Sequence, residues 1–423
     1  MHRLRRMNPH RAARARSLIT GQTLRAFSTP GFWRIWTGSM VWYSARWMDL
    51  FVLQWQVLVT TDSALQVALV GFYRMLPMFV LGLFTGLIAD RFDRRTVLLF
   101  AQLWNAAASA SLGILALTDR LALWHLAILV TALGFAWALD MPSRRSYIYD
   151  MIGPRRVVNA MALDRVGMDG AKMLGPALGG LLWPVIGTGG CLLLLAIGYM
   201  VNFYLYLGVP PAPPARATSP GPVMRNLAEG VAYAFRNPVI LGVLAITAVM
   251  NLLGFPYQQL APVMGKQILE LGPQLTGLLV SADGLGAFAS SLLIASRRDV
   301  RYKGRLFVIG SVLLMAAVLA FSISRQYLLS FALFALAGAG LAGFATMQAT
   351  LILTSASDAM RGRAMGALML AIGFGPLGTL LIGVLASAVG APVALTLTAG
   401  AGLLLLVAIL SKAPTLWRLG AAL

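Results

Sequence analysis

The sequence has few charged residues for its length. Of its 423 residues only 11% are Asp, Glu, Lys or Arg, whereas 59% are hydrophobic. A soluble domain of this size carries about 25% charged residues to cover its surface. A chain this apolar, with a mean hydropathy of +0.78, is therefore expected to lie in a lipid bilayer.

Cysteine and histidine are also scarce. The single cysteine, Cys191, excludes an intramolecular disulfide, and nothing in the sequence resembles a Cys/His metal site. No Gly-Lys-Ser/Thr phosphate-binding loop is present, so ATP is not the expected energy source. We therefore expect no cofactor and no metal, and we do not expect an enzyme.

Basic residues, by contrast, are in large excess, with 34 Lys and Arg against 14 Asp and Glu. They fall in short clusters between long apolar runs rather than on one continuous face. This pattern argues against nucleic-acid binding and is typical of orientation signals in membrane loops. Residues 1–31 are basic and polar, and no short apolar segment with a cleavage site follows them. They are expected to form a cytoplasmic arm rather than a removable signal peptide.

Long apolar runs recur along the rest of the chain. A helix needs about 20 apolar residues to cross the hydrocarbon core of a membrane, and by that length the sequence predicts an all-α integral membrane protein with twelve transmembrane helices. The expected spans are 33–59, 64–88, 96–117, 122–142, 157–183, 189–208, 239–262, 273–296, 306–323, 327–353, 363–386 and 390–411. Every second loop holds most of the Lys and Arg, while the loops between hold Arg120, Lys266 and Arg325. This asymmetry predicts that both termini are cytoplasmic.

The loop after the sixth span differs from the others. Residues 209–222 are rich in Pro and Ala and indicate an extended linker. Apolar residues then recur every four positions from Val223 to Phe235, with polar residues between them, and Pro238 follows. This pattern predicts a short amphipathic helix on the cytoplasmic surface that separates two halves of the chain.

An internal repeat supports the division. Residues 87–95 match residues 293–301, and the same offset aligns Gly134 with Gly340. Repeated six-span halves are how many secondary transporters are built, with the substrate site between them. The predicted units are an arm at 1–31, a six-helix bundle at 32–208, a linker at 209–238, a second six-helix bundle at 239–411 and a cytoplasmic tail at 412–423.

Two short motifs resemble signatures of the major facilitator superfamily. The run Gly86-Leu87-Ile88-Ala89-Asp90-Arg91-Phe92-Asp93-Arg94-Arg95 resembles its signature between spans 2 and 3, with Asp93 in place of the second glycine. Gly175-Pro176-Ala177-Leu178-Gly179-Gly180 resembles the GPxxGG core of the antiporter signature of drug exporters. The chain resembles the enterobactin-exporter and macrolide-efflux branch, although the span-4 arginine of many drug/proton antiporters is missing. The resemblance implies two pseudo-symmetric six-helix bundles and drug:proton antiport.

Charged side chains inside the first bundle are candidates for function. Each costs about 2.5–3.5 kcal/mol to insert at a helix centre, so each needs a reason. In span 1, Trp42, Arg46 and Asp49 lie on one helical face, and Arg46 and Asp49 can pair within the helix. In span 5, Asp169 and Lys172 can pair in the same way and share a face with the GPxxGG motif. Asp49 and Asp169 are therefore candidates for the coupling proton, and a structural ion pair is the alternative for each.

Other polar residues stand in apolar surroundings. Arg74 in span 2 and Asp283 in span 8 are each expected to face the cavity or a partner on another helix. Arg74 can bind an anionic substrate or neutralise Asp49, and Asp283 is the third candidate for the coupling proton. In span 7, Asn251 and Gln258 can bind a polar ligand or satisfy backbone groups that a nearby proline frees. The expected substrate cavity is lined by Trp42, Arg46, Arg74, Lys172, Asn251 and Gln258.

A gating cluster is implied by the resemblance alone. Asp90 would lie near the N-terminal end of span 11, where the helix dipole favours an anion. Asp140, at the cytoplasmic end of span 4, could pair with Arg94 and lock the outward-facing state. The implied gating motif consists of Gly86, Asp90, Arg91, Arg94, Arg95 and Asp140.

The leading hypothesis is a secondary active transporter in the cell inner (plasma) membrane. It would export a small amphipathic molecule, such as a drug, siderophore or metabolite, by alternating access in exchange for protons. One alternative is a metabolite importer or uniporter of the same fold, with Arg74 or Arg46 binding a carboxylate. Another is a non-transporting scaffold or sensor, although a scaffold has no need of internal charges. The expected partners are the substrate, protons and the lipid bilayer, and the chain is expected to work as a monomer.

Overall fold

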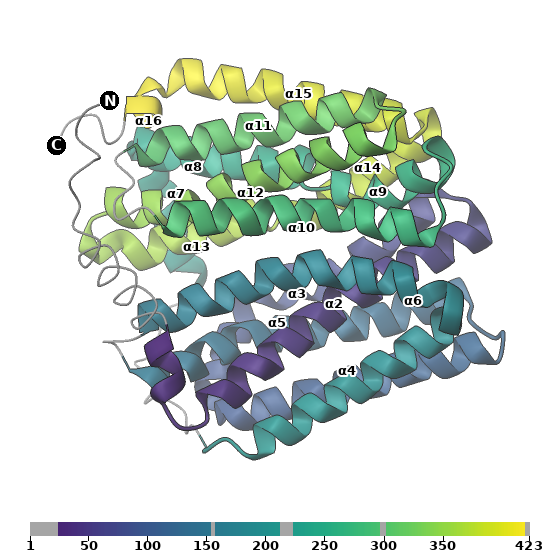
Figure 1. The fold of residues 1–423 in the computed structure, drawn as a ribbon. Helices are drawn as coiled ribbons and strands as arrows, with labels where there is room; N and C mark the ends of the chain where they lie inside the picture. The colour runs from purple at the N-terminus through teal and green to yellow at the C-terminus, as the bar shows by residue number, and fades with distance from the viewer. Residues whose placement is uncertain (1–23, 154–156, 212–222, 297–301, 419–423) are drawn as a thin grey trace, which may run out of the picture.

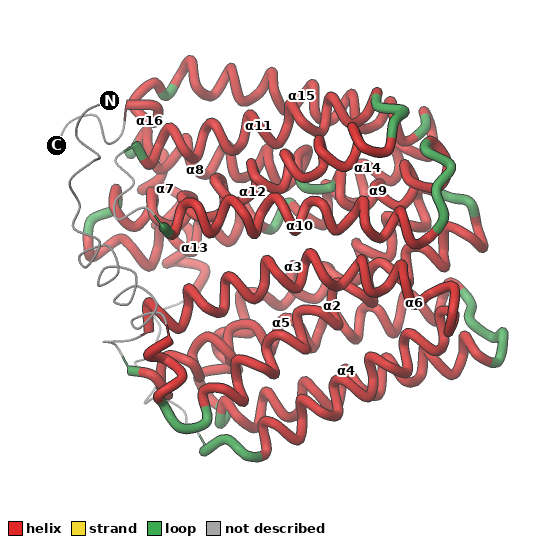
Figure 2. The backbone as a smooth tube through the Cα atoms, viewed as in Figure 1, coloured by secondary structure: helices red, strands yellow, loops and turns green. Residues whose placement is uncertain are grey.

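The computed structural model describes residues 24–153, 157–211, 223–296 and 302–418. Within these ranges the side chains of 24–25, 81–91, 158, 223–224, 226 and 418 are not described. The described chain consists of helices and short loops and contains no strand (Figure 2). The predicted all-α class is therefore confirmed.

The helices of the first half run almost without interruption. They are η1 (Leu24–Ser28), α2 (Phe32–Thr61), α3 (Ala64–Arg91), α4 (Arg94–Leu117), α5 (Leu123–Ile152) and α6 (Val157–Leu207). Helix α6 contains the fifth and sixth predicted spans, and Gly187 breaks it with a left-handed φ of 65° that a residue without a Cβ adopts readily. Asp93, which stands where the signature has a glycine, caps α4 by accepting a hydrogen bond of 2.8 Å from the Thr96 amide.

The second half begins with α7 (Val223–Arg236), which matches the predicted amphipathic helix. The remaining elements are α8 (Pro238–Val249), η2 (Met250–Gly254), α9 (Tyr257–Val263), η3 (Met264–Ile268), α10 (Pro273–Ala295), α11 (Lys303–Ile323), α12 (Tyr327–Ser355), η4 (Asp358–Met360), α13 (Arg361–Ile372), α14 (Gly375–Val389), α15 (Ala391–Lys412) and α16 (Pro414–Arg418). Among them α7 packs against the start of α13, where Glu229 pairs with Arg363 at 3.0 Å.

Two predicted spans are not continuous α-helices. The seventh is divided into α8, η2, α9 and η3, and the η segments are wide π-turns such as Phe255 N–H to Met250 O at 2.7 Å. Pro256 and Pro262 have no N–H to continue the α-helical pattern, which favours such a break. The eleventh span is divided into α13 and α14 just before Pro376. The lengths of the apolar runs placed these spans correctly but did not predict the breaks.

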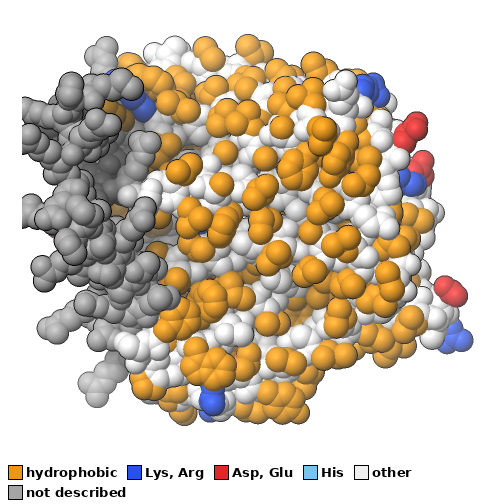
Figure 3. All heavy atoms as spheres, viewed as in Figure 1, with side chains coloured by type: hydrophobic (Ala, Val, Ile, Leu, Met, Phe, Trp, Pro, Cys, Tyr) orange, Lys and Arg blue, Asp and Glu red, His pale blue; other side chains and the backbone are white. Residues whose placement is uncertain are grey.

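The described residues supply twelve membrane passes. Nine helical segments in this part of the chain are long and apolar enough to cross a membrane, and the kinked α6 segment contributes two passes. The other two predicted spans correspond to α2, which is 30 residues long and carries charged side chains, and to α3, whose described apolar part is Ala64–Val80. Hydrophobic side chains cover the face seen in Figure 3, and the charged ones in view lie toward its edges.

The helices form two groups that contact each other mainly through two pairs of helices. Helices α2 to α6 pack mainly against one another, as do α8 to α15, while α6 contacts α10 and α3 contacts α14 across the boundary (Figure 1). One end of the molecule holds η1, α7 and α16 and is called here the near end. The opposite end, which holds the α2–α3 loop and the Gly187 kink, is called the far end.

Candidate functional site

The GPxxGG motif packs α6 closely against helices on two sides. A Cβ on Gly180 would lie 2.5 Å from the Pro273 carbonyl oxygen of α10. A Cβ on Gly175 would lie 2.6 Å from the Trp47 Cβ of α2, and one on Gly179 would lie 3.1 Å from the Phe51 ring. Because small residues let backbones approach, the motif joins α6 to its own group through α2 and to the other group through α10.

An ion pair crosses the boundary between the two groups of helices. Lys172 Nζ of α6 lies 2.5 Å from Asp283 Oδ2 of α10, and both side chains are at least nine-tenths buried. Gln258 Nε2 donates to the same carboxylate oxygen at 2.8 Å. The sequence predicted that Asp283 would have a partner on another helix, and it has one. The predicted pairing of Lys172 with Asp169 is wrong, because the Lys172 side chain reaches across the boundary instead.

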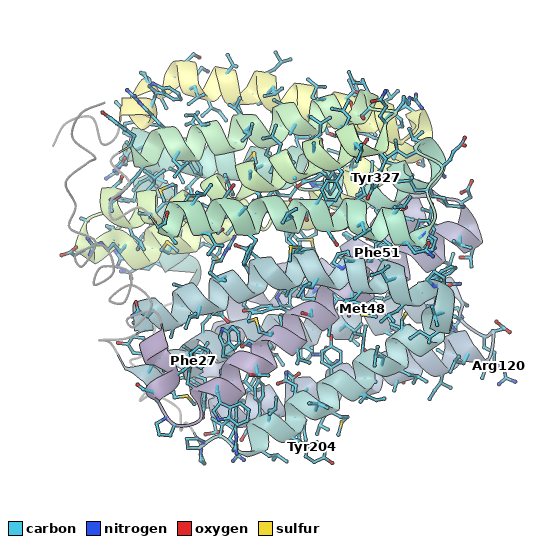
Figure 4. All side chains as sticks on the ribbon, in the orientation of Figure 1. Phe27, Met48, Phe51, Arg120, Tyr204 and Tyr327 are labelled. Atoms are coloured by element: carbon cyan, nitrogen blue, oxygen red, sulfur yellow. The ribbon has the colours of Figure 1, made fainter. Side chains whose placement is uncertain are left out.

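A cavity surrounds this ion pair. Its water-accessible volume is about 20 Å³, room for a single water molecule. Both groups of helices contribute its walls, which are aromatic and apolar around a few polar groups: Trp47, Leu50, Phe51, Gln54, Lys172, Pro176, Gln258, Val280, Asp283 and Phe334. Figure 4 shows Phe51, on α2, where that helix lies next to the other group. In this conformation the two groups are closed around the pair.

Asp169 belongs to a second contact across the boundary. Arg165 Nε lies 3.1 Å from Asp169 Oδ2, one turn back along α6, and Ser291 Oγ of α10 donates to the same oxygen at 2.8 Å. The side chain of Arg165 is 37% exposed, whereas that of Asp169 is buried. Asp169 is therefore already paired with a cation, but not with the one that the sequence predicted.

A buried cluster of two arginines and one aspartate lies within the first group. Arg74 Nη2 of α3 donates to Asp49 Oδ2 of α2 at 2.9 Å, Arg74 Nη1 lies 2.7 Å from Asp49 Oδ1, and both residues are buried. The predicted pairing of Arg46 with Asp49 within α2 is wrong. Arg46 lies instead over the Trp137 ring, 3.7 Å from its centroid, and its Nε has no hydrogen-bond partner among the described residues. The cluster therefore holds one more cation than anion.

Two other cavity candidates are engaged elsewhere. The ring of Trp42 is buried under the guanidinium of Arg144, 4.6 Å from its centroid, and does not line the cavity. Asn251 Nδ2 donates to the Thr247 carbonyl at 2.9 Å, one turn back, next to the η2 segment. It therefore satisfies backbone in a broken helix, which was the alternative to ligand binding.

The gating motif is only partly described. Gly86, Asp90 and Arg91 fall in α3, but their side chains lie outside the described residues. Arg94 pairs with Asp150, and Arg95 donates to the Leu207 carbonyl at 2.6 Å. Asp140 binds Arg144 on its own helix, with an N–O distance of 2.5 Å, so the predicted pair of Asp140 with Arg94 is absent from this conformation.

The far end is closed by polar contacts between the two groups. Lys266 Nζ of η3 lies 2.8 Å from Asp62 Oδ1, in the α2–α3 loop, and Gln267 donates to the Asp62 carbonyl at 3.1 Å. The hydrogen bond from Lys266 holds the pKa of Asp62 below its usual range, and a second bond from Gln267 adds to this. Deeper in the molecule, Gln54 donates to Gln259 at 2.5 Å. Sequence reasoning missed this contact, although Lys266 was one of few cations on the sparsely charged side.

A larger apolar cavity lies where α3 meets α13 and α14. Its water-accessible volume is about 150 Å³. Its described lining contains no charged side chain and consists of Met75, Met78, Phe79, Met369, Leu370, Ile372, Gly373 and Pro376. Methionine is flexible and polarisable, so such a lining adapts to apolar groups of different shapes. Nothing in the sequence predicted this cavity, since no periodic pattern links α3 with α13 and α14.

Comparisons with known proteins agree with this architecture. The staphyloferrin A transporter of Staphylococcus aureus is 21% identical over 359 residues, covering 84% of this chain and 89% of the relative. The enterobactin exporter EntS of Shigella flexneri is 25% identical over 311 residues, or 74% of each chain. An uncharacterised MFS-type transporter of Bacillus subtilis, YfiS, is 25% identical, and the match spans 57% of its length.

The solved structure of the nucleoside transporter NupG has the same fold, with a TM-score of 0.74 at 13% identity, covering 90% of this chain and 99% of NupG. A family model described as transmembrane secretion effector matches residues 22–420. The chain belongs to this family of MFS-type membrane transporters.

Proposed function

We propose that this secretion effector exports a small amphipathic organic anion by alternating access, in exchange for protons that enter the cell. The observation that carries the proposal is the Lys172–Asp283 ion pair, which lies inside a cavity that both groups of helices line. A substrate that binds there contacts both groups at once, as alternating access requires.

The ion pair offers a way to couple substrate to movement. Lys172 and Asp283 attract each other across the boundary and are shielded from water, so the pair stabilises the closed arrangement seen here. An anionic group that binds Lys172 competes with Asp283 and weakens this attraction. The cavity, with about 20 Å³ of water-accessible volume, must widen to admit such a molecule.

The chemistry of the walls indicates the class of substrate. Aromatic and aliphatic side chains form most of the cavity around the ion pair, and a methionine-rich cavity lies between α3 and α13–α14. Arg46 supplies a positive charge that no carboxylate among the described residues balances. Together these features suit a molecule with an apolar or aromatic body and an anionic group. Two relatives are named as transporters of the siderophores staphyloferrin A and enterobactin, which makes these compounds suitable probes.

The proposed direction of transport and the proposed membrane location rest on the distribution of charged residues and on one relative. The excess of Lys and Arg in alternate loops predicts cytoplasmic termini, and therefore a multi-pass protein of the inner membrane whose near end faces the cytoplasm. One of the relatives is named an exporter. We propose the same direction here, with the chain acting as a monomer.

The test is flux through purified protein in liposomes, with enterobactin and staphyloferrin A as probes. Substrate movement and internal pH are recorded together for the wild type and for Lys172→Gln. We expect probe movement against its gradient when a pH gradient is imposed, and loss of that movement in Lys172→Gln. Probe movement without proton movement would identify a uniporter, and accumulation in the opposite direction would identify an importer.

A further inference from the structure

A second buried ionic cluster lies in the first group of helices, and it is closer to the near end than the cavity is. It consists of Asp140 and Arg144 of α5, Asp164 of α6 and Tyr43 of α2. All four side chains are buried, and Asp164 is 5% exposed. The proposed binding of substrate at the Lys172–Asp283 pair does not involve these four residues.

The two carboxylates of this cluster have different partners. Arg144 Nε donates to Asp140 Oδ1 at 2.8 Å, and Gln102 Nε2 donates to Asp140 Oδ2 at 3.0 Å. Asp164 receives a hydrogen bond from Tyr43 Oη, which lies 3.1 and 3.3 Å from its two oxygens. Among the described residues no cation lies within 4.0 Å of the Asp164 carboxylate. Asp140 is therefore neutralised by an arginine, whereas Asp164 has a neutral partner.

The surrounding charges do not balance Asp164. The titratable and charged groups that face it are Tyr43 of α2, Asp140, Arg144 and Arg145 of α5, and Arg165 of α6 itself. Of the three arginines, Arg144 is already bound to Asp140, Arg165 is bound to Asp169, and Arg145 is exposed to solvent, which screens its charge. The buried cluster therefore carries one net negative charge when Asp164 is ionised and none when it is protonated. Because burying an unbalanced charge is costly, the site favours binding a proton.

The lack of a paired cation distinguishes Asp164 from the three carboxylates that the sequence suggests as candidates for the coupling proton. Asp49, Asp169 and Asp283 each have a cation within 3.1 Å, so protonating any of them leaves a buried or half-buried cation without its partner. Protonating Asp164 breaks no ion pair. Tyr43 remains a suitable partner in both forms, since its hydroxyl donates to a carboxylate and accepts from a carboxylic acid.

We propose that Asp164 is the site that binds and releases the transported proton. The inference rests on the proposed proton-coupled export and names the residue that performs the coupling. A proton from water adds to one Asp164 oxygen and forms an O–H bond, and the same proton leaves to water when the site faces the other side. Asp164 lies two turns before Lys172 on α6, about 12 Å along the helix axis. Its change of charge therefore acts on the helix that forms the contact with α10.

Infrared difference spectroscopy tests the protonation directly and needs no substrate. Spectra of the purified protein at about pH 5 and about pH 9 bracket the range in which a coupling acid titrates. We expect a carboxylic acid C=O band that disappears at high pH, is missing in Asp164→Asn and shifts in frequency in Tyr43→Phe. The matched control is Asp169→Asn, which removes a paired carboxylate of the same helix and leaves the band in place. Absence of the band from the wild type, or its persistence in Asp164→Asn, would overturn the assignment.

A transport measurement in liposomes tests the coupling, with enterobactin and staphyloferrin A as probes. We expect Asp164→Asn to retain exchange of probe at equal pH and to lose accumulation driven by a pH gradient, while Asp164→Glu retains both. Retained accumulation in Asp164→Asn would contradict the proposal. If the wild type moves probe but no protons, proton-coupled export fails as the function, and the infrared result still decides whether Asp164 titrates.

Discussion

Gly180 of α6 and Gly277 of α10 face each other across the boundary between the two groups of helices. A Cβ on Gly277 would lie 2.9 Å from the Gly180 Cα and 2.5 Å from the Pro176 carbonyl oxygen. Both atoms are backbone, so no side chain can rotate away to make room. The contact lies on the far-end side of Lys172 and Asp283, and it therefore helps to define the conformation in which the cavity is closed.

Gly277→Ala should shift the protein away from this conformation. The added methyl group overpacks a backbone contact, which costs about 1–3 kcal/mol and corresponds to a shift of about 5–150-fold in the conformational equilibrium. Spin labels at Arg120→Cys and Arg325→Cys, which are exposed at the far end on opposite groups, report the change as a longer distance. Figure 4 shows Arg120 at this end. Since Cys191 is the single cysteine, Cys191→Ser gives a clean background.

The control for this prediction is Gly170→Ala on α6, the helix against which Gly277 packs. A Cβ at Gly170 would meet only the Phe288 ring of α10, at 3.8 Å, which is ordinary van der Waals contact. The label distance should stay at its wild-type value. An equal change in Gly170→Ala and Gly277→Ala would mean that any methyl group added between α6 and α10 has this effect, and that the Gly180–Gly277 contact has no special role.

Neutralising one member of the Lys172–Asp283 pair should be worse than removing both. Lys172→Met leaves Asp283 as a buried carboxylate without its cation, which typically costs about 3–5 kcal/mol. The double variant Lys172→Met/Asp283→Leu removes both charges and should recover most of the lost stability without recovering transport. Thermal unfolding in detergent gives the Tm of each variant, and liposome flux gives the transport. Equal Tm values for the single and double variants would show that the pair is not coupled.

The helices predicted from local pattern were correct, whereas the ion pairs predicted within a single helix, Arg46 with Asp49 and Asp169 with Lys172, were wrong. The helix at Val223–Arg236 follows from a period within its own sequence. Arg46 and Asp49 do lie on one helix, but the guanidinium of Arg74, from a neighbouring helix, pairs with the Asp49 carboxylate in place of Arg46. Spacing along one helix identifies residues that can meet, but it gives no information about competitors from another helix.

The same reasoning explains why Asp164 is not among the candidates for the coupling proton that the sequence suggests. In the sequence, Asp164 and Arg165 are adjacent charged residues near one end of the fifth predicted span, and this position favours a structural network over a coupling site. In the structure Arg165 turns to Asp169, one turn further on, and Asp164 is left with Tyr43 from α2. The property that matters, a buried carboxylate without a cation, depends on three helices and cannot be read from one.

Acid should weaken the contact between Asp62 and Lys266 at the far end. The pKa of Asp62 is lowered in the closed conformation by hydrogen bonds from Lys266 and Gln267. Its stabilising contribution is therefore complete above the ordinary aspartate pKa, about 4, and is lost as the pH falls through the lower value. Titration of Asp62 should therefore leave the distance between labels at positions 120 and 325 constant from about pH 8 to about pH 5. Below about pH 4 the same titration should lengthen this distance.

Asp62→Asn isolates this effect from other groups that titrate in acid. The variant cannot gain or lose a charge at this position, so its label distance should lack the part of the acid response that belongs to Asp62. Identical acid responses in the wild type and in Asp62→Asn would show that the Lys266 contact does not hold the far end closed.

Replacing Arg46 should weaken binding of anionic probes and spare neutral ones. The guanidinium lies 3.7 Å over the Trp137 ring and has no carboxylate partner within 4.0 Å among the described residues, so an anionic ligand that reaches it would balance its charge. A hydrogen bond to a charged group contributes about 1.5–3 kcal/mol, and Arg46→Gln should therefore raise the KM for staphyloferrin A by about 10–150-fold.

A methyl ester of the same probe, which lacks the carboxylate charges, serves as the control because it has no anion for Arg46 to bind. Arg46→Lys keeps the charge but loses the flat stacking on Trp137, so it should fall between the wild type and Arg46→Gln. An equal rise in KM for the acid and its ester would assign Arg46 to the packing of α2 against α5, since packing affects both probes alike. A rise confined to the acid would identify Arg46 as a second residue, beside Lys172, that binds the anion.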